Sequence, residues 1–180
     1  MKRFWTAAKA VEAGGDFAIA LDGRRVKTPA RADLLLPTGA LADAIAAEWN
    51  ACGEIVEPRA MRLTGLANAA IDRIAPDKEN YAAAIASYGE SDLVCYRAEG
   101  PETLVRRQEE SWDSLLQWAR RRYDVDFACQ AGIVHVAQPP ETVRKLAHAV
   151  ALLDPFQLAG LSPLVTIGGS LVAALAVLDE

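Results

Sequence analysis

Residues 17–28 read FAIALDGRRVKT, and this stretch decides the fold of the first part of the chain. Asp22-Gly23 separates two strand-like runs, and this dipeptide supplies the positive backbone angles that a tight primed turn requires. The stretch therefore predicts an antiparallel hairpin. Pro29 ends the second strand, and Leu34-Leu35-Leu36 before Pro37 predicts one more strand of the same small sheet.

Helical patterns occupy most of the remaining chain. Thr38 and Asp77 are suited to cap helices, because their side-chain oxygens can accept hydrogen bonds from the first turn. Pro101 and Pro139-Pro140 suit the first turn itself, and apolar side chains recur at helical spacing after each of these starts. The predicted helices cover residues 38–50, 63–74, 77–88, 101–123 and 139–153.

Two further β segments are predicted among these helices. Leu93–Tyr96 is an apolar run that we expect to be extended, and residues 127–136 around Gly132 predict a second short hairpin. The resulting fold class is α+β, with a small amino-terminal β-rich portion packed on a larger carboxyl-terminal helical domain. We place the β-rich subdomain, with one helix, at residues 1–58 and the helical domain at residues 59–180.

Composition limits the classes of partner. The chain has 180 residues, of which 52% are hydrophobic, so it can bury one good core and needs no disulfides to do so. Its formal net charge of -5 disfavours nucleic acid as a partner, since that binding depends on Lys and Arg neutralising phosphates. The first residues lack the apolar stretch of a secretory signal, so we expect a bacterial cytoplasmic protein or a processed mitochondrial-matrix form.

The sequence contains no constellation typical of catalysis. It has neither a phosphate-binding Gly-Lys loop nor a GxGxxG fingerprint, and His135 and His148 have no carboxylate or cysteine at motif spacing. Cys52, Cys95 and Cys129 are widely separated and form no CxxC pair, so neither a disulfide framework nor a zinc site is indicated. We expect no enzyme activity, no cofactor and no bound metal.

Cys95 lies between Val94 and Tyr96 and is interpreted as a buried small hydrophobic residue. An alternative function remains open, in which a small soluble enzyme uses Cys95 with His135. That alternative requires the two side chains to lie within hydrogen-bonding reach of each other.

Residues 155–178 carry no charged side chain, a length that could cross a bilayer. A tail-anchored membrane protein is therefore a second alternative. Pro163 interrupts the run, Gly168-Gly169-Ser170 lowers its hydrophobicity, and acidic residues rather than Lys or Arg flank it. A buried helical hairpin is the preferred interpretation, and we expect no membrane insertion.

Four tryptophans are the strongest candidates for contacts with a protein partner, because Trp is enriched at interface hot spots. Trp49 and Trp112 lie on amphipathic helical stripes and are interpreted as core. Trp118 lies at the edge of its stripe and Trp5 near the terminus, so these two are predicted partner contacts. Arg62, in the loop before a predicted helix, is the third.

An ordered series of short motifs runs through nearly the whole chain. The series consists of Lys2-Arg3-Phe4-Trp5, Leu21-Asp22-Gly23-Arg24, Lys27-Thr28-Pro29, Ala47-Glu48-Trp49, Leu66-Ala67-Asn68, Ala70-Ile71-Asp72, Asp92-Leu93, Cys95-Tyr96-Arg97, Trp112-Asp113 and Gly169-Ser170-Leu171. In this order the motifs resemble those of one family, the assembly chaperones of the ATP synthase catalytic head of the Atp-twelve type. The resemblance implies the same β-rich and helical portions as above.

The resemblance also implies a function. Members of that family bind the free alpha subunit of ATP synthase and shield the surface that the beta subunit later covers, without hydrolysing ATP. We therefore expect the alpha subunit as the partner and a monomeric chaperone. Arg62 stands where the family usually has Pro. Members usually continue beyond Asp179-Glu180 into a helical segment with an acidic, Trp-containing motif, which is absent from this sequence.

Overall fold

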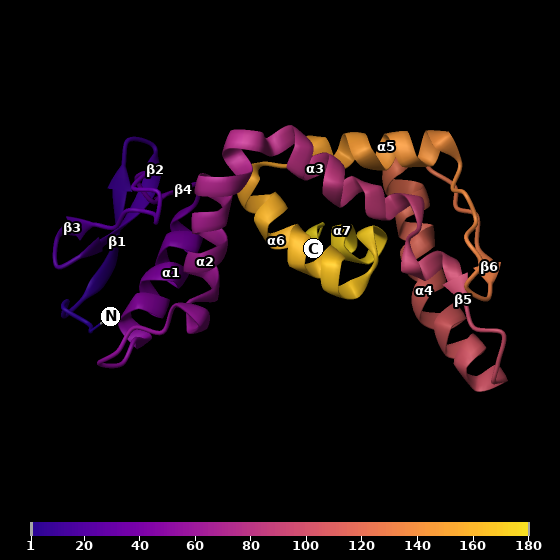
Figure 1. The fold of residues 1–180 in the computed structure, drawn as a ribbon, viewed down its shortest axis with the longest axis horizontal. Helices are drawn as coiled ribbons and strands as arrows, with labels where there is room; N and C mark the ends of the chain where they lie inside the picture. Colours follow the sequence, from indigo (N-terminus) through magenta and orange to yellow (C-terminus); the bar gives the residue numbers. More distant parts are fainter. Residues whose placement is uncertain (1, 180) are drawn as a thin grey trace. The chain divides into compact units, whose positions relative to one another are not determined.

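The computed structural model describes residues 2–179, which form two compact units, Met1–Pro76 and Asp77–Glu180 (Figure 1). Among the described residues, the first unit contains the four-stranded sheet and two α-helices, and the second contains five α-helices. The fold is α+β, as predicted. The domain division that the sequence suggested, between residues 58 and 59, stays a prediction.

A small antiparallel sheet forms the first layer of the amino-terminal unit. Its strands are β1 (Ala8–Ala13), β2 (Asp16–Leu21), β3 (Arg24–Arg25) and β4 (Leu35–Leu36), and the other three all pair with β2. The predicted hairpin is confirmed, because Leu21 pairs with Arg24 across Asp22 and Gly23, whose φ angles are 47° and 85°. Strand β1 was not predicted.

Two helices complete this unit. Helix α1 (Gly39–Ala51) begins after Thr38, whose hydroxyl accepts a hydrogen bond from the Leu41 amide at 3.2 Å, as the sequence predicted. Helix α2 (Arg62–Ala69) continues into a π-helical turn, Ala70–Ile74. Short 3-10 turns cover Pro58–Ala60 and Ala75–Asp77. The core between the sheet and the helices contains Ile19, Leu34, Leu36 and Ile45, all completely buried.

Charged and amide side chains fasten these elements together. The Arg3 guanidinium donates to the carbonyl oxygens of Asn50 at 3.2 Å and Cys52 at 2.6 Å, where α1 ends. The Glu48 carboxylate accepts from the amides of Leu63 at 2.7 Å and Thr64 at 2.9 Å, which caps α2.

The side chain of Asn50 meets the backbone of β1. Its amide nitrogen donates to the Ala8 carbonyl at 2.8 Å, and its amide oxygen accepts from the Ala8 N–H at 2.8 Å. Asn50 thus pairs with the outer edge of β1 in the way that a neighbouring strand would.

The carboxyl-terminal unit is a helical bundle. Its helices are α3 (Lys78–Ala86), α4 (Glu102–Tyr123), α5 (Pro140–Ala151), α6 (Pro155–Gly168) and α7 (Leu171–Leu178). In Figure 1, α3 and α5 run across one side of the α6–α7 pair. Leu116 of α4, Leu146 and Val150 of α5, Leu158 and Leu161 of α6 and Leu171 of α7 are almost completely buried and form the core.

The uncharged stretch at residues 155–178 is a pair of packed helices, as preferred from the sequence. Gly169, with φ of 69°, makes the turn between them. Among residues 2–179, no helix combines the length and the apolar composition that a membrane crossing requires. The tail-anchor alternative depended on one continuous helix over this stretch, and the structure divides the stretch into α6 and α7.

Two predicted β segments are corrected by the structure. Leu93–Cys95 forms a 3-10 turn rather than an extended run, because the Asp92 carboxylate accepts from the Val94 amide at 3.1 Å and starts the turn. The second hairpin does not form. Instead β6 (Gln130–Ala131) pairs in parallel with β5 (Tyr96–Arg97), which lies far away in the sequence.

The predicted cap at Asp77 is also corrected. Its side chain makes no capping hydrogen bond to α3, and its carboxylate instead accepts from the Asn80 amide group at 2.7 Å. Asp92 has the more extensive capping role. It is completely buried, and besides Val94 it accepts from the amide of Val172 at 2.8 Å, so that one carboxylate caps both the 3-10 turn and α7.

Candidate partner-binding groove

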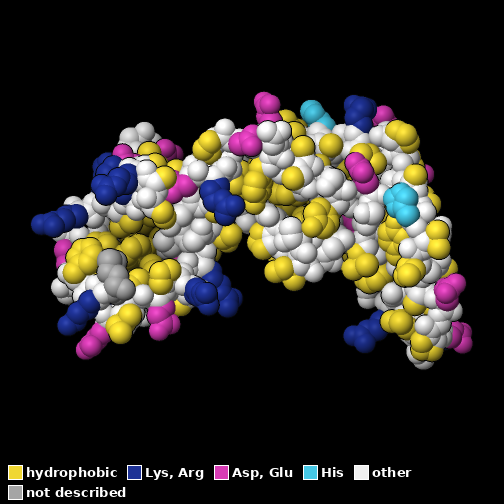
Figure 2. Space-filling model, viewed as in Figure 1, with side chains coloured by type: hydrophobic (Ala, Val, Ile, Leu, Met, Phe, Trp, Pro, Cys, Tyr) yellow, Lys and Arg dark blue, Asp and Glu magenta, His cyan; other side chains and the backbone are white. Residues whose placement is uncertain are grey.

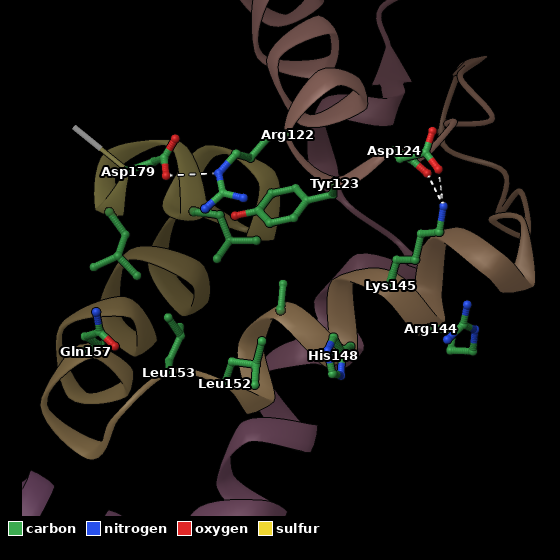
Figure 3. Close-up of a pocket in the computed structure, with 13 residues that line it drawn as sticks. Arg122, Tyr123, Asp124, Arg144, Lys145, His148, Leu152, Leu153, Gln157 and Asp179 are labelled. Carbon is green, nitrogen blue, oxygen red and sulfur yellow. Dashed lines mark hydrogen bonds and ion pairs between the residues drawn. The ribbon is translucent and has the colours of Figure 1, made fainter.

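The carboxyl-terminal unit has a groove where the ends of α4, α5 and α7 meet. We define the α4–α5–α7 groove by Tyr123, Lys145, His148, Leu152, Leu178 and Asp179. Its volume is about 720 Å³, and its lining combines apolar and charged side chains (Figure 3). This mixture is typical of a surface that binds another protein rather than of a catalytic pocket.

Apolar side chains line the lower part of the groove. Leu152 is 70% exposed and Leu178 is 37% exposed, although both are large hydrophobic residues. Leu153 and Leu175 lie beside them, and Leu175 is buried. The end of α5 and the last turn of α7 therefore present apolar surface that the fold itself does not cover. On the face that Figure 2 shows, hydrophobic side chains gather in several patches, and charged side chains lie mostly around them.

Ion pairs form the upper rim. Asp124 follows the last residue of α4 with a left-handed φ of 52°, and this conformation turns its carbonyl and its carboxylate toward α5. Lys145 donates to both oxygen groups at 2.6 Å, which holds the pKa of the Asp124 carboxyl below its usual range. Arg122 Nε reaches the Asp179 carboxylate at 3.2 Å, which ties α4 to α7.

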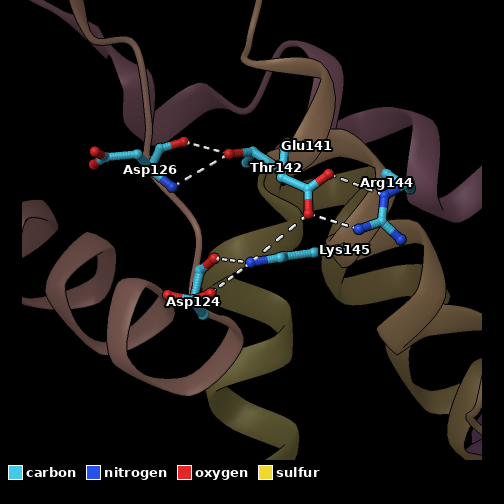
Figure 4. Close-up of polar contacts among 6 residues, drawn as sticks. All are labelled: Asp124, Asp126, Glu141, Thr142, Arg144 and Lys145. Carbon is cyan, nitrogen blue, oxygen red and sulfur yellow. Dashed lines mark hydrogen bonds and ion pairs between the residues drawn. The ribbon is translucent and has the colours of Figure 1, made fainter.

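A third ion pair lies on the exposed surface of α5. Arg144 donates to the Glu141 carboxylate at 2.6 Å, and this hydrogen bond lowers the pKa of Glu141 (Figure 4). Thr142 fixes the start of the same helix, because its hydroxyl donates to the Asp126 carbonyl at 2.5 Å. These pairs are exposed, so each contributes little to stability and mainly orients the charged rim.

Trp118 adjoins this groove through one aromatic contact. Its ring lies 5.6 Å from that of Tyr123 in an edge-to-face arrangement, and Tyr123 lines the groove. Burial raises the pKa of the Tyr123 hydroxyl, while the Arg122 guanidinium lies 5.3 Å from its ring centre. Trp118 itself is half-buried. Trp5 has a similar position in the amino-terminal unit, because Phe4 and Trp49, which contact its ring, line a hollow there.

The other two predicted contacts lie in the amino-terminal unit. Trp5 is only 4% exposed, contrary to the free terminus that the sequence suggested. Its ring packs edge-to-face on Trp49 at 5.0 Å, and its N–H donates to the Trp49 carbonyl at 3.3 Å. Phe4 beside it is 67% exposed. Arg62 is exposed at the first position of α2.

Sequence reasoning did not single out the groove itself. Its apolar residues come from the end of α5 and the end of α7, which are separated in the sequence by α6. In the sequence, each of these ends continues the apolar stripe of its helix, so its residues are interpreted as core. One local signal of the groove was Leu152-Leu153 immediately before Asp154, because these two apolar residues continue past the end of α5 at Ala151.

The proposed Cys95–His135 pair is not formed. Cys95 is completely buried, and burial raises the pKa of its thiol to about 12, the opposite of what a nucleophile needs. His135 is exposed, and its Nδ1 lies 3.2 Å from the Tyr96 hydroxyl. Within the described part of the chain, no hydrogen bond joins Cys95 to His135, and no cluster of His, Cys, Asp and Glu could hold a metal ion.

Comparison with known proteins gives concordant matches. Residues 2–120 match the family described as ATP12 chaperone protein. The mitochondrial protein atp12 of Schizosaccharomyces pombe is 26% identical over 191 residues, which cover 98% of this chain and 65% of that protein. This chain therefore spans less than two thirds of the length of that relative.

Solved structures agree with the sequence matches. The crystal structure of Atp12 from Paracoccus denitrificans superposes with a TM-score of 0.93 at 44% identity, covering 99% of this chain and 76% of that one. A structure from Agrobacterium tumefaciens, described as that of a chaperone candidate, gives a TM-score of 0.91 at 38% identity, covering 97% of this chain and 66% of that one.

Proposed function

This chain belongs to the ATP12 chaperone family, and from that premise we propose that it binds the free alpha subunit of ATP synthase and shields its interface during assembly of the catalytic head. The observation that carries the proposal is the match of both sequence and fold to Atp12 proteins. The beta subunit would then displace the chaperone when the hexamer forms. This function requires no chemical step. The compartment would be the bacterial cytoplasm or the mitochondrial matrix.

The α4–α5–α7 groove supports the proposal by its physical character. An unassembled subunit exposes apolar surface that would otherwise self-associate, and a chaperone must cover such surface reversibly. Leu152 and Leu178 offer exposed apolar area, while Lys145 and Arg122 offer charges that are already oriented by Asp124 and Asp179. A groove of this kind suits weak, exchangeable contacts better than permanent burial.

Trp118 and Arg62 remain predicted contacts with the alpha subunit. Trp118 would act at the margin of the groove through Tyr123, and Arg62 would act from the start of α2. Trp5 is buried, so its contribution would be indirect, by holding the exposed Phe4 ring, which lies 5.2 Å from the Trp5 ring.

The direct test mixes the purified chain with free alpha subunit and measures the mass of the complex by size-exclusion chromatography with light scattering. The longer Atp12 protein of Paracoccus denitrificans serves as a parallel sample. A stoichiometric complex with this chain supports the proposal and places the binding surface within it. If neither protein forms a complex, the alpha subunit is not the partner.

A pair of matched variants tests the groove. We expect Leu152→Asp to weaken binding of the alpha subunit tenfold or more, about 1.4 kcal/mol, because it places a charge on exposed apolar surface in the groove. Leu104→Asp makes the same change at a residue of α4 that is 42% exposed and does not line the groove. Equal weakening by both variants would show that the groove has no special role.

A further inference from the structure

Two cysteines that are far apart in the sequence are neighbours in the carboxyl-terminal unit. Strands β5 and β6 run parallel, with Tyr96 opposite Gln130 and Arg97 opposite Ala131. Cys95 immediately precedes β5 and Cys129 immediately precedes β6, so the parallel pairing brings the two cysteines to the same end of the strand pair. Neighbouring strands lie roughly 4.8 Å apart, and disulfides form when the Cα atoms are about 4.4–6.8 Å apart.

The side chains of Cys95 and Cys129 also lie in the same environment. Cys129 is exposed and lines a hollow together with Arg97, Asp113 and Leu116. Cys95 ends the 3-10 turn that leads directly into β5, and Arg97 is the last residue of β5. Burial raises the pKa of the Cys95 thiol to about 12, and the Cys129 thiol is the next largest cause of that rise. Two thiols influence each other in this way only at close range.

We propose that Cys95 and Cys129 form a reversible disulfide when the protein meets a low-molecular-weight disulfide such as oxidised glutathione. The position of both cysteines directly before the paired strands and the closeness of their thiols carry this assignment. It is independent of which protein the chaperone binds.

The reaction proceeds by two thiol–disulfide exchanges. Cys129 reacts first because it is exposed, whereas Cys95 is buried and holds its proton. The Cys129 thiolate attacks one sulfur of oxidised glutathione, a mixed disulfide forms, and one glutathione leaves and takes up the proton that Cys129 released. Cys95 then attacks the Cys129 sulfur, the Sγ–Sγ bond forms, and the second glutathione leaves with the proton from Cys95. Two protein thiols are oxidised, and one oxidised glutathione is reduced by two electrons to two thiols.

The disulfide would fix the connection between α4 and α5. Hydrogen bonds hold this segment at several points: the β5–β6 pairing, the Gln138 amide nitrogen that donates to the Ala128 carbonyl at 2.8 Å, and the contact between the Tyr96 hydroxyl and His135. The same segment presents Ile133 and Val134, which are 95% and 70% exposed. Oxidation would therefore add a covalent link beside the segment that carries this exposed apolar tip.

The test incubates the native full chain in glutathione buffers of increasing oxidised fraction, followed by acid quench, alkylation of free thiols and tryptic mapping by mass spectrometry. The expected product links the peptide of residues 79–97 to the peptide of residues 123–144. Cys52→Ser should give the same product, since Cys52 lies in the other unit with its sulfur 3.7 Å from that of Met61. Cys95→Ala should instead accumulate the mixed disulfide on Cys129.

Three results would overturn the proposal. The first is a parent protein that retains a free Cys95 thiol while Cys129 is fully glutathionylated. The second is a linkage of either residue to Cys52. The third is a linkage found only between two chains, which non-reducing electrophoresis would reveal. The first result is measured on the parent protein, so it tests the Cys95–Cys129 disulfide even if a cysteine variant folds poorly.

Discussion

Removing the Asp92 carboxylate should destabilise the carboxyl-terminal unit more than any surface change. The carboxylate accepts from the amides of Val94 and Val172, and hydrogen bonds to a charged group contribute about 1.5–3 kcal/mol each. The loss of two such bonds is partly offset, because the charged form no longer has to be buried. We expect Asp92→Ala to lower the free energy of unfolding by about 2–4 kcal/mol. Asp92→Asn keeps one acceptor and should cost about 1–2 kcal/mol.

Thermal unfolding followed by circular dichroism measures this effect. For a chain of this length, 1 kcal/mol shifts the midpoint by about 2–4 °C, so Asp92→Ala should lower it by roughly 4–16 °C. Asp43→Ala is the control, because Asp43 is an exposed carboxylate on α1. If Asp92→Ala stays within about 0.5 kcal/mol of the parent, the double capping role is refuted.

The pH dependence gives a second check on the same residue. Burial raises the pKa of the Asp92 carboxyl, and hydrogen bonds from Ser170 and Val172 only partly oppose that rise. The folded protein therefore keeps this proton to a higher pH than the unfolded chain does. The contribution of Asp92 to stability is fully present below its unfolded pKa and falls as pH rises through its folded pKa. The stability advantage of the parent over Asp92→Asn should accordingly grow as pH is lowered from 7 toward about 4. An advantage that shrinks on acidification would contradict this account.

Three further predictions concern other parts of the chain. Glu48→Ala removes the acceptor for the first amides of α2 and should cost about 2–3 kcal/mol in urea unfolding; an unchanged midpoint would show that water replaces the cap. Gly23→Ala should cost about 1–2 kcal/mol because its φ is 85°, whereas Gly53→Ala, with open space and ordinary φ, should change stability little. Lys145→Met should raise the pKa of the Asp124 carboxyl toward its usual range in an NMR titration, and an unmoved titration would show that Lys145 does not set it.

Local signals predicted most of the secondary structure. The Asp22-Gly23 turn, the Thr38 cap and the helix from Pro101 are decided by residues within a few positions, and the structure agrees with each. The errors occur where distant residues decide. The second hairpin was wrong because β6 pairs with β5 across the length of α4, and no local pattern encodes such a partner.

The motifs that carried the family resemblance have mostly structural roles. Arg3 closes the end of α1, Glu48 caps α2, and Asp92 caps α7. In the motif Leu21-Asp22-Gly23-Arg24, the Asp22 carboxylate accepts from the Ala7 amide at 2.9 Å. These residues identify the scaffold, which is why they predicted the family correctly. They do not mark the groove, whose apolar residues lie outside every one of them.

The contact between Asn50 and Ala8 affects whether the edge of the sheet can pair with another chain. An open strand edge offers unpaired N–H and C=O groups that can recruit another chain into a growing sheet. Asn50 occupies both backbone groups of Ala8, and Lys9 and Glu12 place charges along the rest of that edge. The outer edge of β1 is therefore protected at Ala8 against pairing with a strand of another chain.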